Sequence, residues 1–231
     1  MKKNLRKLCL GLFAVVLTTS YVSAQLTFGT RAGFNYTNMT YKYDGNKQDI
    51  NKFKSGFQIG VVADYKISEV LSIQPGFLFA QQGYKSTIFT PNSTVNLNYL
   101  QVPINAQFKF PLGRIDLLIQ TGPYLGFAIN GKFKYWDENG KKMSDEDYKE
   151  LTGHEVPKIS FGNDWGKDTM KSFDFGIGFG AGLQFGNIQA GLGYNIGLRD
   201  LTVHKKKDTI TQLMSLKNKG LALTITYLFG N

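Results

Sequence analysis

Large apolar residues alternate with small or polar ones in one segment after another beyond residue 25. The clearest case is SFDFGIGFGAGLQFG, residues 172–186, where phenylalanine and leucine face one way and mostly glycine the other. Side chains of a β-strand point alternately to its two faces, so this period predicts strands. Eight strands are predicted, at 26–36, 54–67, 70–84, 94–110, 114–130, 172–186, 187–200 and 219–229.

The connections between these strands alternate in length. Short turns are expected at 68–69, 111–113 and 186–187, and longer loops at 37–53, 85–93, 131–171 and 201–218. In an antiparallel meander this alternation places every short turn at one end of the sheet and every long loop at the other. Transmembrane β-barrels have this form, with an even number of strands, short turns on one side and long loops on the other.

The glycines at 176, 178, 180 and 182 indicate which face points inward. An eight-stranded barrel has an interior only wide enough for side chains, so small residues suit its inner face. The bulky residues then face outward, where lipid accepts them. We therefore predict an all-β fold, an eight-stranded antiparallel up-and-down transmembrane β-barrel. A soluble, lipocalin-like ligand-binding barrel stays open as an alternative, because strand glycines also mark bulges and tight corners.

Polar and charged residues on the predicted inner face carry both signs. The set comprises Arg31, Asp64, Lys66, Asp116, Gln120, Asp174 and Arg199, together with Gln58, Gln74, Asn105 and Gln107. Buried charges are retained when they are paired and hydrogen-bonded, so we expect a structural polar network. A narrow ion path is the alternative interpretation.

Three prolines lie inside predicted strands, Pro75, Pro103 and Pro123. Proline has no backbone N–H, and a closed barrel has no free edge to accommodate the lost donor. Each proline therefore predicts a bulge or a gap in the hydrogen-bond ladder. The apolar pattern of the fourth strand also changes phase, which predicts a β-bulge near Tyr99 and Leu100.

The first 24 residues have the pattern of a secretory signal. Basic residues precede an apolar run from Leu8 to Leu17, and small residues before Gln25 suit a cleavage site. A membrane anchor is the alternative, but this run is shorter than the roughly 20 residues that span a bilayer. Residues 25–231 are then expected to form one outer-membrane β-barrel domain.

Charge and cysteine content exclude several kinds of site. The formal charge is +10, and removal of the four cations of the leader leaves about +6, with no basic stripe typical of nucleic-acid binding. Cys9 is the only cysteine and lies in the leader, so the mature chain is expected to have no disulfide and no thiolate metal ligand. The acidic run 137–150 does not match a calcium loop.

The two histidines, His154 and His204, both lie in predicted long loops. An enzyme at the barrel rim could use them, but nothing in the sequence fixes their geometry, so we expect no catalytic, cofactor or metal site. The loop 131–171 is long enough for a short helix near 144–151 with Ser144 as its N-cap. Trp136 and Trp165 could fold this loop over the barrel mouth or anchor it at the membrane interface.

Several stretches resemble a known family: SIQPGFLFAQQG, NYLQVPINAQFKF, QTGPYLGF, FDFGIGFGAGLQFGNIQAGLGYNIGLRDL and LALTITYLF. The chain resembles the outer-membrane β-barrel domain family of Bacteroidota, often described as PorT-like or porin-family, over nearly all of residues 25–231. The resemblance implies insertion by the barrel-assembly machinery. The final strand resembles a C-terminal assembly signal, formed by Gly220, Leu223, Ile225, Tyr227 and Phe229. Gly230 and Asn231 follow the last aromatic residue, which departs from a strictly terminal signal.

From these patterns we expect a non-enzymatic integral protein of the outer membrane, without cofactors and without a nucleic-acid partner. Its expected partners are outer-membrane lipid, the barrel-assembly machinery, and extracellular or envelope proteins that contact the loops 37–53 and 131–171. Some members of the resembling family are accessory components of a secretion system, which is a second interpretation. An enzyme at the rim is a third.

Overall fold

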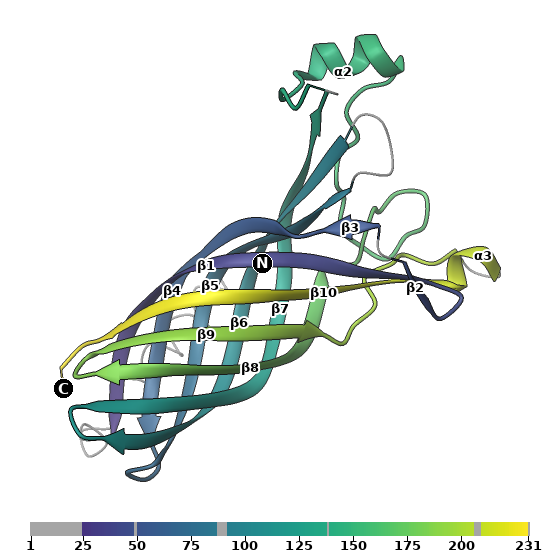
Figure 1. The fold of residues 1–231 in the computed structure, drawn as a ribbon. Coiled ribbons are helices and arrows are strands. Elements are labelled where there is room, and N and C mark those ends of the chain that lie inside the picture. Colours follow the sequence, from purple (N-terminus) through teal and green to yellow (C-terminus); the bar gives the residue numbers. More distant parts are fainter. Residues whose placement is uncertain (1–24, 49, 87–91, 138, 206–208, 231) are drawn as a thin grey trace, which may run out of the picture.

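A computed structural model describes residues 25–48, 50–86, 92–137, 139–205 and 209–230, so the expected signal in residues 1–24 lies outside the described residues. Eight long strands form the wall (Figure 1). They are β1 (Leu26–Tyr43), β4 (Lys54–Lys66), β5 (Leu71–Ser86), β6 (Asn92–Leu112), β7 (Ile115–Trp136), β8 (Phe173–Phe185), β9 (Ile188–Gly197) and β10 (Met214–Leu228). The short strands β2 (Asn46–Gln48) and β3 (Asn51–Lys52) pair with the ends of β1 and β5.

The sheet closes on itself. Each wall strand pairs antiparallel with the next one along the chain, and β1 also pairs with β10 from Gly29↔Leu228 to Tyr43↔Met214. Closure leaves the wall without a free edge, which is the requirement for a sheet in lipid. The predicted eight-stranded antiparallel barrel is confirmed.

Several strands are longer than predicted at the long-loop end. β1 continues to Tyr43, β7 to Trp136, and β10 begins at Met214, so parts of the expected loops 37–53, 131–171 and 201–218 are sheet. Neighbouring strands extend together there and keep satisfying each other's backbone groups. The seventh strand is shorter than predicted, because β9 ends at Gly197.

The predicted sidedness is confirmed. Phe175 is 40% exposed on the outer face, and Leu223 and Ile225 are 60% and 61% exposed, whereas Arg31 is only 6% exposed inside. Gly176 shows why the inner face needs glycine. A Cβ there would lie 2.2 Å from the Ile196 carbonyl oxygen and 2.6 Å from the ring of Tyr124, which packs directly over it.

The three prolines lie side by side on β5, β6 and β7. Pro75 is opposite Ile104, and Pro103 is opposite Tyr124, the neighbour of Pro123. Pairing skips two residues on each strand near them, between β4 and β5, between β5 and β6, and between β6 and β7. The predicted ladder gaps are therefore present, and they form a continuous proline seam across these strands.

The predicted bulge lies at the expected level but on the neighbouring strand. Asn98 pairs with Asn130 and Tyr99 pairs with Ala128, which leaves Ile129 of β7 as the extra residue. β6 itself keeps its phase, and Val95, Leu97 and Tyr99 point inward because the interior changes from polar to apolar toward the long-loop end. The apparent phase change thus reflects a change in the contents of the barrel.

Two short helices lie outside the wall. α2 (Asp145–Thr152) lies beyond the tip of the β6–β7 extension, and α3 (Thr209–Gln212) precedes β10 (Figure 1). Ser144 caps α2, because its side chain accepts from the Asp147 N–H while the Asp147 carboxylate accepts from the Ser144 N–H. The predicted helix and cap are confirmed. Neither helix in the described part of the chain is long and apolar enough to span a bilayer.

Candidate functional site

Charged and amide side chains fill the barrel interior at the short-turn end. Lys109 Nζ lies 2.8 Å from Asp64 Oδ2, and Ser72 Oγ donates to Asp64 Oδ1 at 2.9 Å. Asp64 is completely buried, so this ion pair and hydrogen bond replace the water that the carboxylate loses on folding. Lys109 was not among the predicted interior residues, although its position two residues from Gln107 on an alternating strand places it on the inner face.

Arg31 extends this cluster across the barrel. We call the whole cluster at the short-turn end the base network; it consists of Arg31, Asp64, Ser72, Gln74, Gln107, Lys109, Gln120 and Thr226. Its Nε donates to Thr226 Oγ1 at 2.9 Å, and its guanidinium also donates to Gln74 Oε1. Gln107 Nε2 donates to Gln74 Oε1 and to Gln120 Oε1, both at 3.0 Å. Arg31, Asp64 and Gln120 are therefore brought together as the sequence predicted, by a chain of amides that crosses from β1 to β7.

Asp174 lies in a separate cluster nearer the long-loop end. Its Oδ2 accepts from Asn218 Nδ2 at 2.8 Å and from the Tyr124 hydroxyl at 3.2 Å. Asn218 Nδ2 also lies 3.3 Å from the Tyr99 hydroxyl. The structure thus holds two polar clusters where the sequence suggested one network.

Three of the predicted residues do not join either cluster. Lys66 is exposed at the end of β4, and Asp116 is half-buried near the start of β7. Arg199 follows the end of β9, and its guanidinium lies 5.0 Å from the centre of the Phe173 ring on the outer face. Lys66 and Asp116 do share the inner face, because their sheet partners Ser72 and Gln184 are buried there, but both lie at strand ends and contact neither cluster. Arg199 lies beyond the last residue of β9, where the alternation no longer applies.

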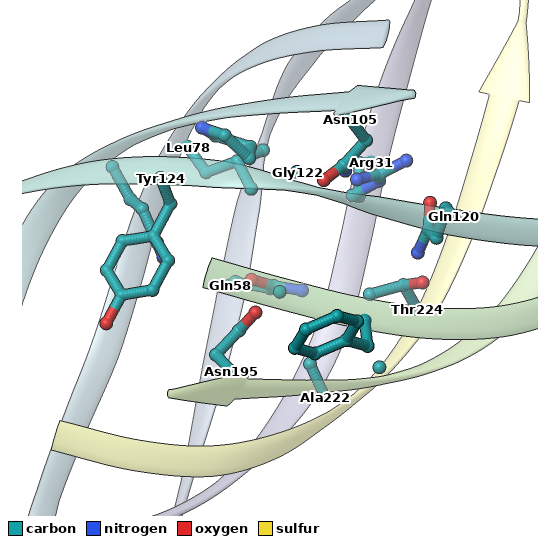
Figure 2. A pocket seen from close by; sticks show the side chains of 15 residues that line it. Arg31, Gln58, Leu78, Asn105, Gln120, Gly122, Tyr124, Asn195, Ala222 and Thr224 are labelled. Carbon is teal, nitrogen blue, oxygen red and sulfur yellow. The ribbon is translucent and has the colours of Figure 1, made fainter. Parts of the chain in front are cut away.

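A small polar cavity separates the two clusters (Figure 2). Its volume is about 50 Å³, enough for a few water molecules, and Figure 2 shows Arg31, Gln120, Tyr124 and Asn195 around it. Gly193 also lines the space, where a Cβ would come no closer than 3.5 Å to another atom. The cavity suits water and gives no room for a larger solute.

An apolar cap closes the interior at the long-loop end. It consists of Met39, Val95, Leu97, Tyr99, Ala128, Met170 and Leu201. Met170 and Leu201 come from loop segments, so the loops after β7 and β9 contribute to closure. Neither Trp136, at the end of β7, nor the half-exposed Trp165 belongs to this cap, so of the two expected roles for these tryptophans, closure of the mouth is not observed. The apolar cap and the ion-paired base network block the axis at both levels.

His204 lies beside Asp200, and a histidine next to an aspartate is also an arrangement found in catalytic sites. Its Nε2 is 2.7 Å from Asp200 Oδ2, and its Nδ1 is 2.6 Å from the Thr211 carbonyl oxygen. Burial alone would raise the pKa of Asp200, but hydrogen bonds from the Leu216 and Thr202 N–H groups and from His204 lower it below its usual value. Both ring nitrogens face acceptors, so neither is free to accept a proton from a nucleophile.

His154 is exposed after α2, and the neighbouring Glu155 pairs with Lys149 at 3.6 Å. The two histidines belong to different loops and share no contact among the described residues. Within that same part of the chain, no group of three or more histidine, cysteine, aspartate or glutamate side chains is close enough to hold a metal ion.

The C-terminal residues of the predicted assembly signal lie on β10 and just beyond it. Leu223, Ile225, Tyr227 and Phe229 face outward and are exposed, while Gly220 approaches Thr37 so closely that a Cβ would lie 2.7 Å from its methyl group. The Phe229 N–H donates to the Phe28 carbonyl oxygen at 2.7 Å, and the Phe229 and Tyr227 rings meet edge to face.

Comparison with solved structures finds other membrane barrels. The outer membrane protein OprG from Pseudomonas aeruginosa is 13% identical, with 89% of this chain and 96% of that chain covered and a TM-score of 0.46. Ail of Yersinia pestis, solved with the heparin analogue sucrose octasulfate, is 17% identical, with coverage of 89% and 99% and a TM-score of 0.37. The outer membrane protease OmpT from Escherichia coli is 10% identical, with coverage of 92% and 99% and a TM-score of 0.30.

A search of curated proteins finds no matching relative. The sequence profile of one family, described as outer membrane protein beta-barrel domain, matches residues 20–203. That match covers most of the chain and agrees with the closed, outward-apolar barrel. The chain therefore belongs to the outer membrane protein β-barrel domain family.

Proposed function

We propose that this outer-membrane barrel is non-enzymatic and works through its long-loop end, which faces outside the cell and docks proteins or adheres to surfaces. The closed interior carries this proposal. The apolar cap and the base network occupy the axis, so the described residues offer no open path for a solute. In contrast, β6 and β7 continue together well past the barrel and carry α2 at their tip (Figure 1).

The environments of the two histidines support the non-enzymatic part of the proposal. His204 is held between a carboxylate and a carbonyl, and His154 is exposed beside an ion pair that is itself exposed. An enzyme at the rim would lose its activity on His154→Ala or His204→Ala. The proposal expects no hydrolytic activity that either substitution removes.

Orientation is tested on intact cells. An epitope inserted between Asn139 and Gly140, in the turn before α2, is expected to be labelled by antibody without permeabilisation. The same epitope between Gly186 and Asn187, in the short β8–β9 turn, is expected to be labelled only after the outer membrane is opened. The reverse labelling pattern contradicts the proposed orientation.

The docking role is tested by replacing residues 131–171 with a short turn. The barrel variant is expected to keep the mobility shift of a folded barrel between unboiled and boiled gel samples, while cells carrying it lose contact-dependent attachment or cross-linked partners. A variant that keeps the mobility shift and also keeps attachment and the cross-linked partners contradicts the docking role of residues 131–171.

Export and assembly complete the proposal. We expect cleavage before Gln25, which N-terminal sequencing of the membrane-bound protein would check. Gly220 and the outward Leu223, Ile225, Tyr227 and Phe229 are expected to act as the assembly signal. Phe229→Ala is therefore expected to lower the amount of folded barrel in the membrane more than Asn231→Ala, two positions further on.

The resemblance to PorT-like proteins favours a second candidate, an accessory component of a secretion system. This role predicts that deletion of the gene changes the set of secreted proteins, whereas a docking role limited to the cell surface leaves that set unchanged. Quantitative proteomics of the culture medium separates the two.

A further inference from the structure

A basic pocket lies beside the outer part of β7, where β6 and β7 extend past the barrel and past the outward apolar residues of its wall. Ile129 is the last exposed apolar residue of β7, and Lys132 follows three positions later, about 10 Å along a strand. Segments 142–145 and 156–159 flank the outer end of β7 and enclose a space of about 580 Å³. That volume is within the range of small-molecule sites and far exceeds the polar cavity inside the barrel.

Four lysines line this pocket, Lys132, Lys134, Lys142 and Lys158, and the carboxylate among the lining residues is Asp145. Four positive charges and one negative charge give a local charge of +3. None of the four lysines forms a salt bridge within the described residues. The N-terminal end of α2 is not an additional anion site, because its capping box and three acidic residues already occupy it.

The arrangement of these lysines is unfavourable in the absence of an anion. Lys132 lies directly opposite Lys158 in an isolated antiparallel bridge, and like charges in that position destabilise a sheet. The positive charge also reaches the inward-facing Lys54 at the outer end of β4. Burial and the charges of Lys134 and Lys85 lower the pKa of Lys54 to about 8.

We propose that this pocket binds an organic ligand that carries two or more phosphate groups. A phosphate monoester carries about −1.5 to −2 charges near neutral pH, so two of them balance the local charge of +3. Apolar side chains, Phe133, Met143 and Ile159 among them, form part of the lining and provide a surface for the carbon skeleton of the ligand. A single inorganic phosphate would leave most of the space empty.

The ligand can come from two sources, the phosphorylated headgroup of an outer-leaflet lipid or a soluble phosphorylated molecule. The pocket deepens the proposed docking role and rests on it for its outward orientation. Binding by the purified full-length protein does not depend on orientation or on a protein partner, so failure of one proposal is distinguishable from failure of the other.

The test uses inositol hexakisphosphate as the probe and inositol as the uncharged control, with the protein in detergent micelles. Lys132→Gln with Lys158→Gln is expected to weaken binding about tenfold or more, since a contact to a charged group contributes about 1.5–3 kcal/mol. The matched control is Lys42→Gln with Lys205→Gln, two exposed lysines outside the pocket, and it is expected to bind like the wild type. Both variants must keep the folded-barrel mobility shift.

A second measurement assigns the source. Phosphatidylcholine nanodiscs with and without diphosphorylated lipid A are compared for displacement of the soluble probe from the wild type. If lipid A displaces the probe, the ligand is a lipid headgroup. If the probe binds tightly and lipid A does not displace it, the ligand is a soluble molecule. Equal affinity of the pocket variant and the wild type, or an equal loss in the control variant, overturns the proposal.

Discussion

Removal of the Lys109 ammonium should destabilise the barrel strongly, because it leaves Asp64 buried without its ion-pair partner. The two side chains are 9% and 0% exposed, and their atoms are 2.8 Å apart. Breaking a buried pair by removing one partner costs about 3–5 kcal/mol. Arg31 contributes a second positive charge near Asp64, so Lys109→Met is expected at the lower end, about 3 kcal/mol.

The free energy of unfolding is measured by urea titration in lipid vesicles. Lys66→Met is the matched control, because Lys66 is exposed and a surface substitution changes stability by about 0.5 kcal/mol or less. Adding Asp64→Asn to Lys109→Met should recover about 2 kcal/mol, since the buried carboxylate that lost its ion-pair partner is then neutral, while Arg31 keeps its hydrogen bonds to Thr226 and Gln74. A loss below 1 kcal/mol for Lys109→Met, or no recovery in the double variant, refutes the base network as a paired structural element.

Three further predictions concern packing, charge and closure. Gly122→Ala should lower the free energy of unfolding by about 1–3 kcal/mol, because its Cβ would lie 1.9 Å from the Ile104 carbonyl oxygen. Gly193→Ala is the control and should leave the thermal unfolding midpoint nearly unchanged. Because the pKa of Lys54 is lowered, the folded protein releases this proton near pH 8 and the unfolded chain near 10.5, so the free energy of unfolding should rise with pH between these values. Urea titrations at both pH limits should show this rise in the wild type and not in Lys54→Met. In planar bilayers the protein should give no steady conductance, and a persistent open channel would contradict closure by the cap and base network.

The barrel was predictable from sequence because alternate residues of each strand show the character of its inner and its outer face. Glycine opposite phenylalanine on β8 requires a crowded side and a lipid side, and the alternation of turn lengths then fixes the meander. The same logic found Arg31, Asp64 and Asp174. It also placed Lys66 and Asp116 on the inner face, but at strand ends where they contact neither cluster. It failed for Arg199, because alternation describes a side chain only within a strand and β9 ends at Gly197.

The apolar cap was harder to anticipate. Val95 and Leu97 look like lipid-facing residues in a strand whose later residues face lipid, and only the three-dimensional structure shows that the interior becomes apolar at this level. The basic pocket was also hidden, since Lys132 and Lys158 are 26 positions apart and meet through a single bridge. Sequence patterns report local periodicity, whereas such contacts depend on how a long loop folds back.

The proline seam makes the β4–β7 side of the barrel wall different from the rest in its backbone pairing. The pairings of β8 with β7 and β9, and of β10 with β9 and β1, run without interruption, whereas all three interfaces from β4 to β7 contain a gap. Fewer backbone pairs hold the side with the gaps, so this compliant side should open locally more easily than the rest of the wall. Amide hydrogens along the compliant side should accordingly be the first in the wall to exchange with solvent deuterium.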